Sequence, residues 1–231
     1  MISTEHLSNL FVDVADTLVA DFDVVDFLTT LCEHATLVSG ADAVGIMLTD
    51  HRGELRFMAA SNDAGRSLEL AQLQFGEGPC LDCVRTRGPV VNTDLAQASG
   101  TWPRFAPSAI DAGFHSVHAF PMRLRDQAIG ALNLFAVTES RFDPGEVRIV
   151  QSLADVATIA ILQERSIARA EALTEQLQGA LNSRIVIEQA KGALARQEGI
   201  TVDEAFERLR QQARSSRQRL VDVAAIVLAG N

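Results

Sequence analysis

Lysine is the residue that this 231-residue chain most conspicuously lacks: Lys191 is the only one, and every other basic residue is arginine. Long apolar runs are also missing, since no stretch reaches the length of about 18 residues that a membrane-spanning helix needs. The first residues contain early acids, no basic segment and no uninterrupted apolar core, which is not typical of a signal peptide. These absences favour a cytoplasmic protein.

Cysteine is scarce as well, and the odd count of three does not indicate a disulfide framework. Cys80 and Cys83 have the spacing of metal ligands or of a redox pair, and His115 and His118 could supply two further zinc ligands. The two histidines are closer together than zinc-binding histidines usually are. We therefore interpret the thiols as half-buried packing groups at a turn into a helix, and we predict no metal site.

Catalytic signatures are absent too. The sequence holds no phosphate-binding P-loop, no nucleophile elbow and no zinc-protease motif. Gly76–Gly78 is too short for a nucleotide fingerprint. We therefore expect a protein that is not an enzyme.

What the chain does contain is enough apolar material for a folded core, with 47% hydrophobic and 22% charged residues. Its formal charge of -10 argues against a protein that coats nucleic acid over its whole surface. The charge is uneven, however. Residues 1–178 carry 12 basic and 24 acidic side chains, whereas residues 179–231 carry 8 and 6. The C-terminal segment is therefore a separate electrostatic unit.

Apolar periodicity predicts an α+β fold for the first 160 residues. Helical spacing covers residues 7–18 and 24–35, and Val90–Val91 is a candidate strand. Two hairpins are predicted from strand-like runs: residues 43–49 with 55–60, and residues 116–124 with 128–137. We expect a largely antiparallel sheet with helices on one face.

A long helix is predicted from Pro144 onward. Asp143 before it fits a capped start with proline in the first turn, and no Gly or Pro interrupts residues 146–178. A helix of that length needs a partner, and a second copy of the chain is the simplest one. The heptad pattern is imperfect near Glu164, so we expect a homodimer through a helical bundle or short coiled coil. Packing of the helix on its own domain is the alternative.

Three short helices are predicted in the tail. The first ends at Gly199, a natural left-handed C-terminal residue. The second begins at Thr201, where a glutamate three residues on completes a capping box. The third is predicted to begin at Ser215, with Gln218 as its capping-box partner. Each helix has one apolar face, and the spacing places Phe206 in the shared core.

The sequence of this tail resembles the ANTAR domain. Residue identity and spacing both match over these segments: Ser183–Leu194, Ala205–Phe206, Leu209–Arg210, Ala213–Arg214 and Leu220–Ala224. The resemblance implies an RNA-binding antiterminator of bacterial transcription that recognises paired stem-loops in leader RNA, usually as a dimer. Ala195 stands where the family commonly has methionine, which is a small packing change.

The first 160 residues resemble a GAF domain more loosely. The resemblance is carried by these segments: residues 43–49 with the helix before them, Gly76–Val84, Val90–Asp94 and Phe120–Leu134. It implies a small-molecule sensor that also dimerises through flanking helices. The resemblance does not identify the ligand or a cofactor, because ligands vary widely within this family. Bilin or haem binding is compatible with the sequence, but no residue requires it.

The two resemblances divide the chain into three parts. A GAF-like sensor covers residues 1–162 with its core from about residue 24, a connecting helix covers residues 163–178, and an ANTAR-like domain covers residues 179–231, with a family match that can begin near residue 167. The expected fold is α+β in the sensor and a three-helix all-α domain in the tail.

The tail offers a set of candidate RNA contacts: Arg184, Lys191, Gly192, Arg210, Arg214, Arg217 and Arg219. Arg184 and Lys191 are seven residues apart and share a helix face. Arg217 and Arg219 are placed in the first turn of the third helix, where they and exposed N–H groups would bind a phosphate. Guanidinium planes would stack on unpaired loop bases. The alternative is a solvated helix face paired with nearby glutamates: Glu188, Glu204 and Glu207.

These features together predict a cytoplasmic, signal-responsive RNA-binding regulator that acts by transcription antitermination. Small-molecule or redox sensing by the first domain would shift the tails through the long helix. The rival hypothesis is a ligand-binding or redox-sensing module whose tail assembles protein partners. An enzyme hidden in the GAF-like pocket is the least favoured alternative.

Overall fold

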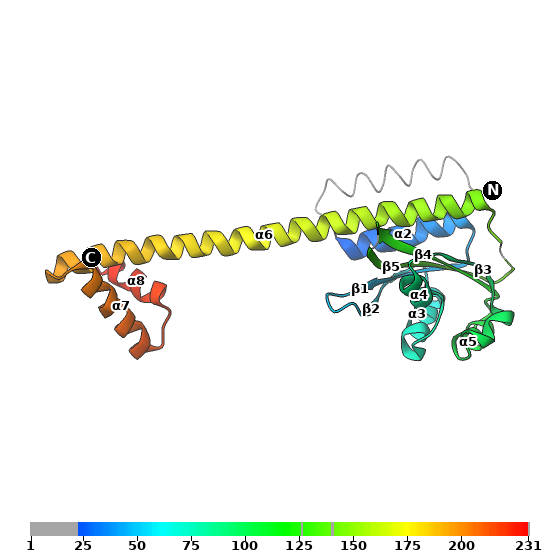
Figure 1. Cartoon of the computed structure of the whole chain (residues 1–231), viewed down its shortest axis with the longest axis horizontal. Coiled ribbons are helices and arrows are strands. Elements are labelled where there is room, and N and C mark those ends of the chain that lie inside the picture. The colour runs from blue at the N-terminus through cyan, green and yellow to red at the C-terminus, as the bar shows by residue number, and fades with distance from the viewer. Residues whose placement is uncertain (1–22, 126, 140, 231) are drawn as a thin grey trace. The chain divides into compact units, whose positions relative to one another are not determined.

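The computed structural model describes residues 23–125, 127–139 and 141–230, which form two compact units divided between Glu164 and Arg165 (Figure 1). The helix predicted over residues 7–18 lies outside the described residues. Within the described ranges, no helix is both long and apolar enough to cross a membrane.

An antiparallel five-stranded sheet, in the order β2-β1-β5-β4-β3, forms the centre of the first unit. Its strands are β1 (Ala43–Thr49), β2 (Leu55–Ala60), β3 (Val90–Asp94), β4 (Ser116–Leu124) and β5 (Gln127–Ala136). Both predicted hairpins are confirmed, as the β1–β2 and β4–β5 pairs. The candidate strand at Val90–Val91 is the start of the edge strand β3, which pairs with β4.

Helices cover both faces of this sheet, and the prediction of one covered face is wrong (Figure 1). One face packs on α2 (Val24–Ser39) and on the first turns of α6 (Pro144–Glu198). The other face carries α3 (Asp63–Phe75), α4 (Pro79–Thr86), the 3-10 helix η1 (Leu95–Gly100) and α5 (Phe105–Asp111). The central strands are buried along nearly their whole length, as a sheet covered on both faces requires.

The start of α6 is capped as predicted. The Asp143 carboxylate accepts hydrogen bonds from the backbone N–H groups of Gly145 at 2.6 Å and Glu146 at 2.9 Å. In return, the Glu146 carboxylate accepts the Asp143 N–H at 3.1 Å. This reciprocal arrangement satisfies the first orphan donors of the helix.

The second unit contains the later part of α6 together with α7 (Val202–Ser216) and α8 (Leu220–Ala229). Its core is small and aliphatic: Ala190, Leu209, Ala213, Val223 and Ala224. The predicted end of the first tail helix at Gly199 is confirmed, with a left-handed φ of 67° at that glycine, but this helix is the last part of the continuous α6 and not a separate short helix. The predicted capping box is confirmed as well, since Thr201 and Glu204 exchange hydrogen bonds at the start of α7.

Two tail predictions are wrong. Helix α7 continues through Ser215, whose hydroxyl donates to a carbonyl of the preceding turn instead of capping a new helix. The helix ends where Arg217 takes a left-handed φ of 54°, and α8 therefore starts only at Leu220. Phe206 is half-buried outside the aliphatic core, because its ring packs against cationic side chains.

The middle of α6 is exposed at every residue from Arg165 to Asn182. Large apolar side chains lie in this stretch, among them Leu173 at 55%, Leu177 at 63% and Leu181 at 54% exposure. They recur every four residues and so lie near one face of the helix. An isolated helix gains little stability without a packed apolar face. In the single chain these leucines are exposed to solvent, and burying them against a partner would stabilise the helix.

Candidate functional site

The predicted RNA contacts all lie in the second unit, but the structure divides them into paired and unpaired cations. Lys191 donates to both carboxylate oxygens of Glu188 at 2.9 Å. Arg210 pairs with Glu207 at 3.0 Å. For these two cations, the alternative of a helix face paired with its own glutamates is what the structure shows.

The Phe206 ring joins these two cations. The Lys191 ammonium lies 5.0 Å and the Arg210 guanidinium 5.7 Å from the ring centroid, both within cation–π range. Only 15% of the Lys191 side chain is exposed. Lys191 on α6 therefore contacts α7 through the Phe206 ring. Because its ammonium is mostly buried and already bonded to Glu188, it is poorly placed to bind an external phosphate.

Arg219 is paired too, through two 2.8 Å hydrogen bonds to the Asp222 carboxylate. It is the N-cap of α8, yet it makes no side-chain cap hydrogen bond. The Asp222 carboxylate sits in the first turn, where it already complements the positive end of the helix dipole. At the predicted phosphate site, the Asp222 carboxylate therefore already occupies Arg219 and would compete with a bound phosphate.

Three predicted contacts remain available to a ligand. Arg184, Arg214 and Arg217 are exposed, and none has an ion pair within the part of the chain that the structure describes. Arg214 and Arg217 lie at the end of α7 and Arg184 lies on α6. Gly192 is exposed with open space around it, so a partner backbone can approach there.

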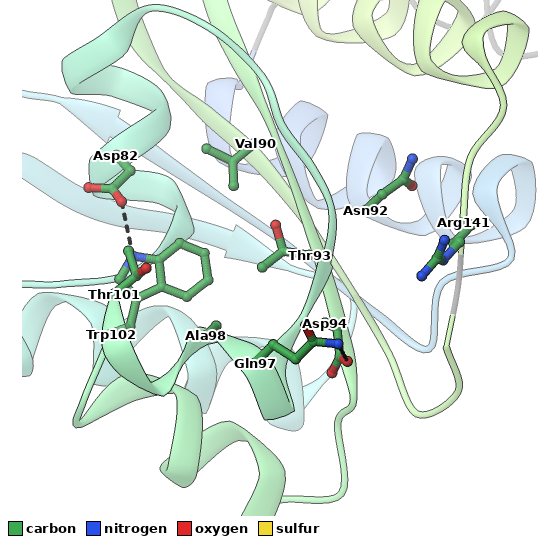
Figure 2. Close-up of a pocket in the computed structure, with 10 residues that line it drawn as sticks. All are labelled: Asp82, Val90, Asn92, Thr93, Asp94, Gln97, Ala98, Thr101, Trp102 and Arg141. Atoms are coloured by element: carbon green, nitrogen blue, oxygen red, sulfur yellow. Dashed lines mark hydrogen bonds between the residues drawn. The ribbon is translucent and has the colours of Figure 1, made fainter.

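A pocket of about 410 Å³ lies in the first unit beside the edge strand β3. Its walls come from α4, β3, η1 and the connection between β5 and α6 (Figure 2). The volume falls in the range of small-molecule sites. Asp82 accepts the indole N–H of Trp102 at 3.0 Å and also pairs with Arg85 at 2.9 Å. Asp94 caps η1 through the backbone of Ala96.

Asn92 connects this pocket to the start of α6. It has a left-handed φ of 56° at a register shift in β3. Its side-chain amide donates to the Phe142 carbonyl at 3.0 Å and accepts the Phe142 N–H at 2.8 Å. Its own backbone N–H donates to Nδ1 of His118, whose ring stacks 4.3 Å from that of Phe142. Burial lowers the pKa of His118 to about 4, so the imidazole is neutral and accepts this bond.

A second polar cluster is fully buried between the sheet and α3. The Glu69 carboxyl accepts hydrogen bonds from Asn133 at 2.7 Å and Gln72 at 3.0 Å, and burial raises its pKa to about 8. Gly45 on β1 makes room for it, because a Cβ at that position would clash with the Glu69 side chain. The Oδ1 atom of Asn133 is buried without a partner in the described structure. A protonated Glu69 and a rotated Asn133 amide would satisfy that acceptor.

Comparison with known protein families assigns both units. The GAF domain family matches residues 23–162, and the ANTAR domain family matches residues 175–228. The chain belongs to the GAF family. It carries an ANTAR domain after its GAF domain, which is the organisation of a signal-sensing RNA-binding regulator. Both domain types are generally regulatory and not catalytic.

Solved structures share the fold of the GAF domain. The GAF domain of a phosphoenolpyruvate-protein phosphotransferase from Coxiella burnetii matches at 18% identity and a TM-score of 0.57, covering 72% of this chain and 99% of that chain. Free methionine-R-sulfoxide reductase from Neisseria meningitidis, solved with its substrate, matches at 20% identity and a TM-score of 0.55, covering 72% and 96%. These likenesses establish the fold alone. No curated protein matches the chain.

The cysteines and histidines of the GAF domain do not converge on one site. Cys80 and Cys83 are buried on α4 against one face of the sheet, whereas His118 stacks on Phe142 on the other face. His115 is exposed. Among the described residues, no group of three or more His, Cys, Asp or Glu side chains could hold a metal ion. Burial raises the pKa of Cys83 to about 12 and that of Cys80 well above its ordinary value, which disfavours the reactive thiolate.

Sequence reasoning missed the pocket and the buried cluster. The pocket residues come from segments as distant as Asp82 and Arg141, and no local pattern joins them. Glu69 had an indirect signal in Gly45, since a glycine inside a strand often marks the close approach of another group. Trp102, the only tryptophan, had no signal that tied it to Asp82.

Proposed function

We propose that this GAF–ANTAR protein is a cytoplasmic bacterial regulator that binds stem-loops in leader RNA and prevents transcription termination. The observation that carries the proposal is a set of exposed arginines in the ANTAR domain of a chain with a net charge of -10. These are Arg184, Arg214 and Arg217, which make no ion pair with another described residue. These guanidinium groups are suited to phosphates and to stacking on unpaired bases. The acidic GAF domain would repel RNA elsewhere and so limit non-specific contact.

The active form in this proposal is a homodimer that forms through α6. Its support is the exposed stripe of Leu173, Leu177 and Leu181, which a second copy of the same helix would bury. Two tails held together would contact the two stem-loops of one leader RNA. Paired contacts of this kind raise the apparent affinity well above that of one tail.

The signal in this proposal is a small molecule bound by the GAF domain. The buried, high-pKa thiols of Cys80 and Cys83 make a redox signal the weaker choice. A ligand in the pocket beside β3 would contact Asn92, which lines the pocket. Asn92 is hydrogen-bonded to the backbone of Phe142, immediately before the residue that caps α6, so a change at Asn92 would alter the start of that helix. Since α6 continues into the ANTAR domain, it is the element that would carry the change.

The test is single-round transcription from a template whose leader RNA is captured by the protein and ends in a terminator. We expect the wild-type chain to increase readthrough, and a variant with Arg184, Arg214 and Arg217 all changed to Ala to leave readthrough at its basal level. Arg52→Ala, at an exposed site on the β1–β2 hairpin, is the matched control. RNA binding without any change in readthrough would rule out antitermination.

A further inference from the structure

The polar groups around the GAF pocket fall into two classes, those already used by the protein and those left for a ligand. Both carboxylates are used. Asp82 accepts from Trp102 and Arg85, and Asp94 accepts from the backbone of η1 and from the Gln97 amide at 2.8 Å. The Asn92 amide is used by the backbone of Phe142.

The groups left over include three side chains that can donate to a ligand, Arg141, Thr93 and Thr101. Arg141 is exposed, and its guanidinium has no ion pair or hydrogen bond in the described residues. The hydroxyls of Thr93 and Thr101 likewise make no hydrogen bond within the described ranges. Figure 2 shows Arg141 at one end of the pocket and Thr101 near the other, with Thr93 between them. These three donors favour a ligand that accepts hydrogen bonds and carries negative charge toward Arg141.

We propose that the pocket binds a small organic carboxylate, with its anionic group on Arg141 and its body on the apolar wall formed by Val90, Ala98 and Trp102. This inference rests on the proposed sensing role of the GAF domain and specifies the chemistry of its signal. One guanidinium and two neutral hydroxyls match a single negative charge. A phosphate dianion is disfavoured because Asp82 and Asp94 line the same pocket and would repel a second charge.

The position of Arg141 gives such a ligand a direct consequence. Arg141 is the residue before Phe142, which Asn92 holds by two hydrogen bonds, and Asp143 after it caps α6. A carboxylate that draws Arg141 toward Thr93 therefore acts on the connection that leads into α6. A ligand elsewhere on the domain would lack this contact with the start of the helix.

Trp102 supplies the readout. It is the only tryptophan of the chain, the chain has no tyrosine, and the indole forms part of the pocket wall. Tryptophan fluorescence of the full chain would be titrated with acetate, pyruvate and benzoate, with acetamide and benzamide as neutral matches, and with inorganic phosphate. We expect saturable titration by at least one carboxylate and none by its amide.

Arg141→Gln should lower the affinity for that carboxylate at least about tenfold, because a charge-assisted hydrogen bond is lost. Thr101→Val should lower this affinity less, and Arg52→Gln on the β1–β2 hairpin should leave the affinity unchanged. The proposal is overturned if no carboxylate titrates Trp102, if an amide or phosphate binds as well as the carboxylates, or if Arg141→Gln binds like the wild type.

RNA capture by the same preparation separates this inference from the proposed function. A wild-type chain that captures RNA but is not titrated by any carboxylate overturns the ligand assignment alone. A chain that is titrated through Arg141 but captures no RNA overturns the proposed function and leaves the ligand assignment standing.

Discussion

The arginines of the ANTAR domain differ in whether their guanidinium groups are already paired with an acidic side chain. Arg214 is exposed with no ion pair in the described structure, whereas Arg219 is held by both oxygens of Asp222. We expect Arg214→Ala to lower leader-RNA affinity about tenfold and to reduce the salt dependence by about one phosphate contact. Arg219→Ala should cost less than about threefold, because its charge is already neutralised.

Filter binding or fluorescence anisotropy across a salt series measures both quantities. Circular dichroism serves as the check that each variant is folded. Equal losses for Arg214→Ala and Arg219→Ala would mean that the ion pairs of the free protein do not decide which cations contact RNA.

The buried Glu69 carboxyl predicts a distinct dependence of stability on pH. Burial raises its pKa from 4.5 to about 8, so the folded state keeps a proton that the unfolded state releases. This contribution to stability is fully present below pH 4.5 and is lost as the pH rises toward 8. The loss is on the order of 1 kcal/mol per pH unit within that window. Glu69→Gln, which cannot ionise, should lack it.

Urea unfolding between pH 5 and 8 measures this effect. The difference in the free energy of unfolding between Glu69→Gln and the wild type should shift in favour of the variant as the pH rises. Glu33→Gln, at an exposed position on α2, is the control and should parallel the wild type. Parallel curves for Glu69→Gln and the wild type would show that Glu69 is ionised in the folded protein.

At the scale of single elements, the exposed middle of α6 makes the sharpest prediction. Leu177 is 63% exposed in the single chain and belongs to the stripe that we propose to pair with a second copy. Leu177→Glu places two like charges in that interface and should convert the dimer to a monomer in sedimentation velocity. Gln176→Glu adds the same charge at the adjacent exposed position and should stay dimeric. A dimer in both variants would place the interface elsewhere.

Elements that depend on local chemistry could be predicted from the sequence, and those that depend on distant contacts could not. The capping box at Thr201 and the β1–β2 hairpin arise from neighbouring residues, and both were predicted. The start of α8 was misplaced because Ser215 and Gln218 imitate a second capping box. The end of α7 is set by a left-handed residue, Arg217, and the sequence has no glycine at that position that would predict it.

The candidate sites show the same division. The seven candidate RNA contacts were predicted from motif and charge. The ion pairs of Lys191, Arg210 and Arg219 with neighbouring acids depend on side-chain geometry that a sequence does not specify. The GAF pocket depends on the tertiary fold, since Asp82 on α4 and Arg141 before α6 line the same pocket only in the folded domain. Covering of both sheet faces was readable from the continuous apolar run of β1, although one face was predicted.

At the scale of the whole molecule, charge and function are divided between the two domains. Residues 1–178 carry 12 basic and 24 acidic side chains and are strongly acidic, whereas residues 179–231 carry 8 and 6 and are slightly basic. A protein built this way should contact RNA through its tails alone. We therefore expect RNA binding to depend on Arg184, Arg214 and Arg217, which make no ion pair with another described residue.

Capture of cellular RNA on the 231-residue protein, followed by sequencing, measures whether these arginines are required for RNA binding. The parallel sample is the variant with Arg184, Arg214 and Arg217 changed to Ala. We predict that the wild-type chain enriches a small set of leader RNAs with two adjacent stem-loops and that the triple variant enriches none of them. Equal recovery with both proteins would show that these arginines are not needed for RNA binding, and no enrichment over background by the wild type would show that the protein does not bind RNA.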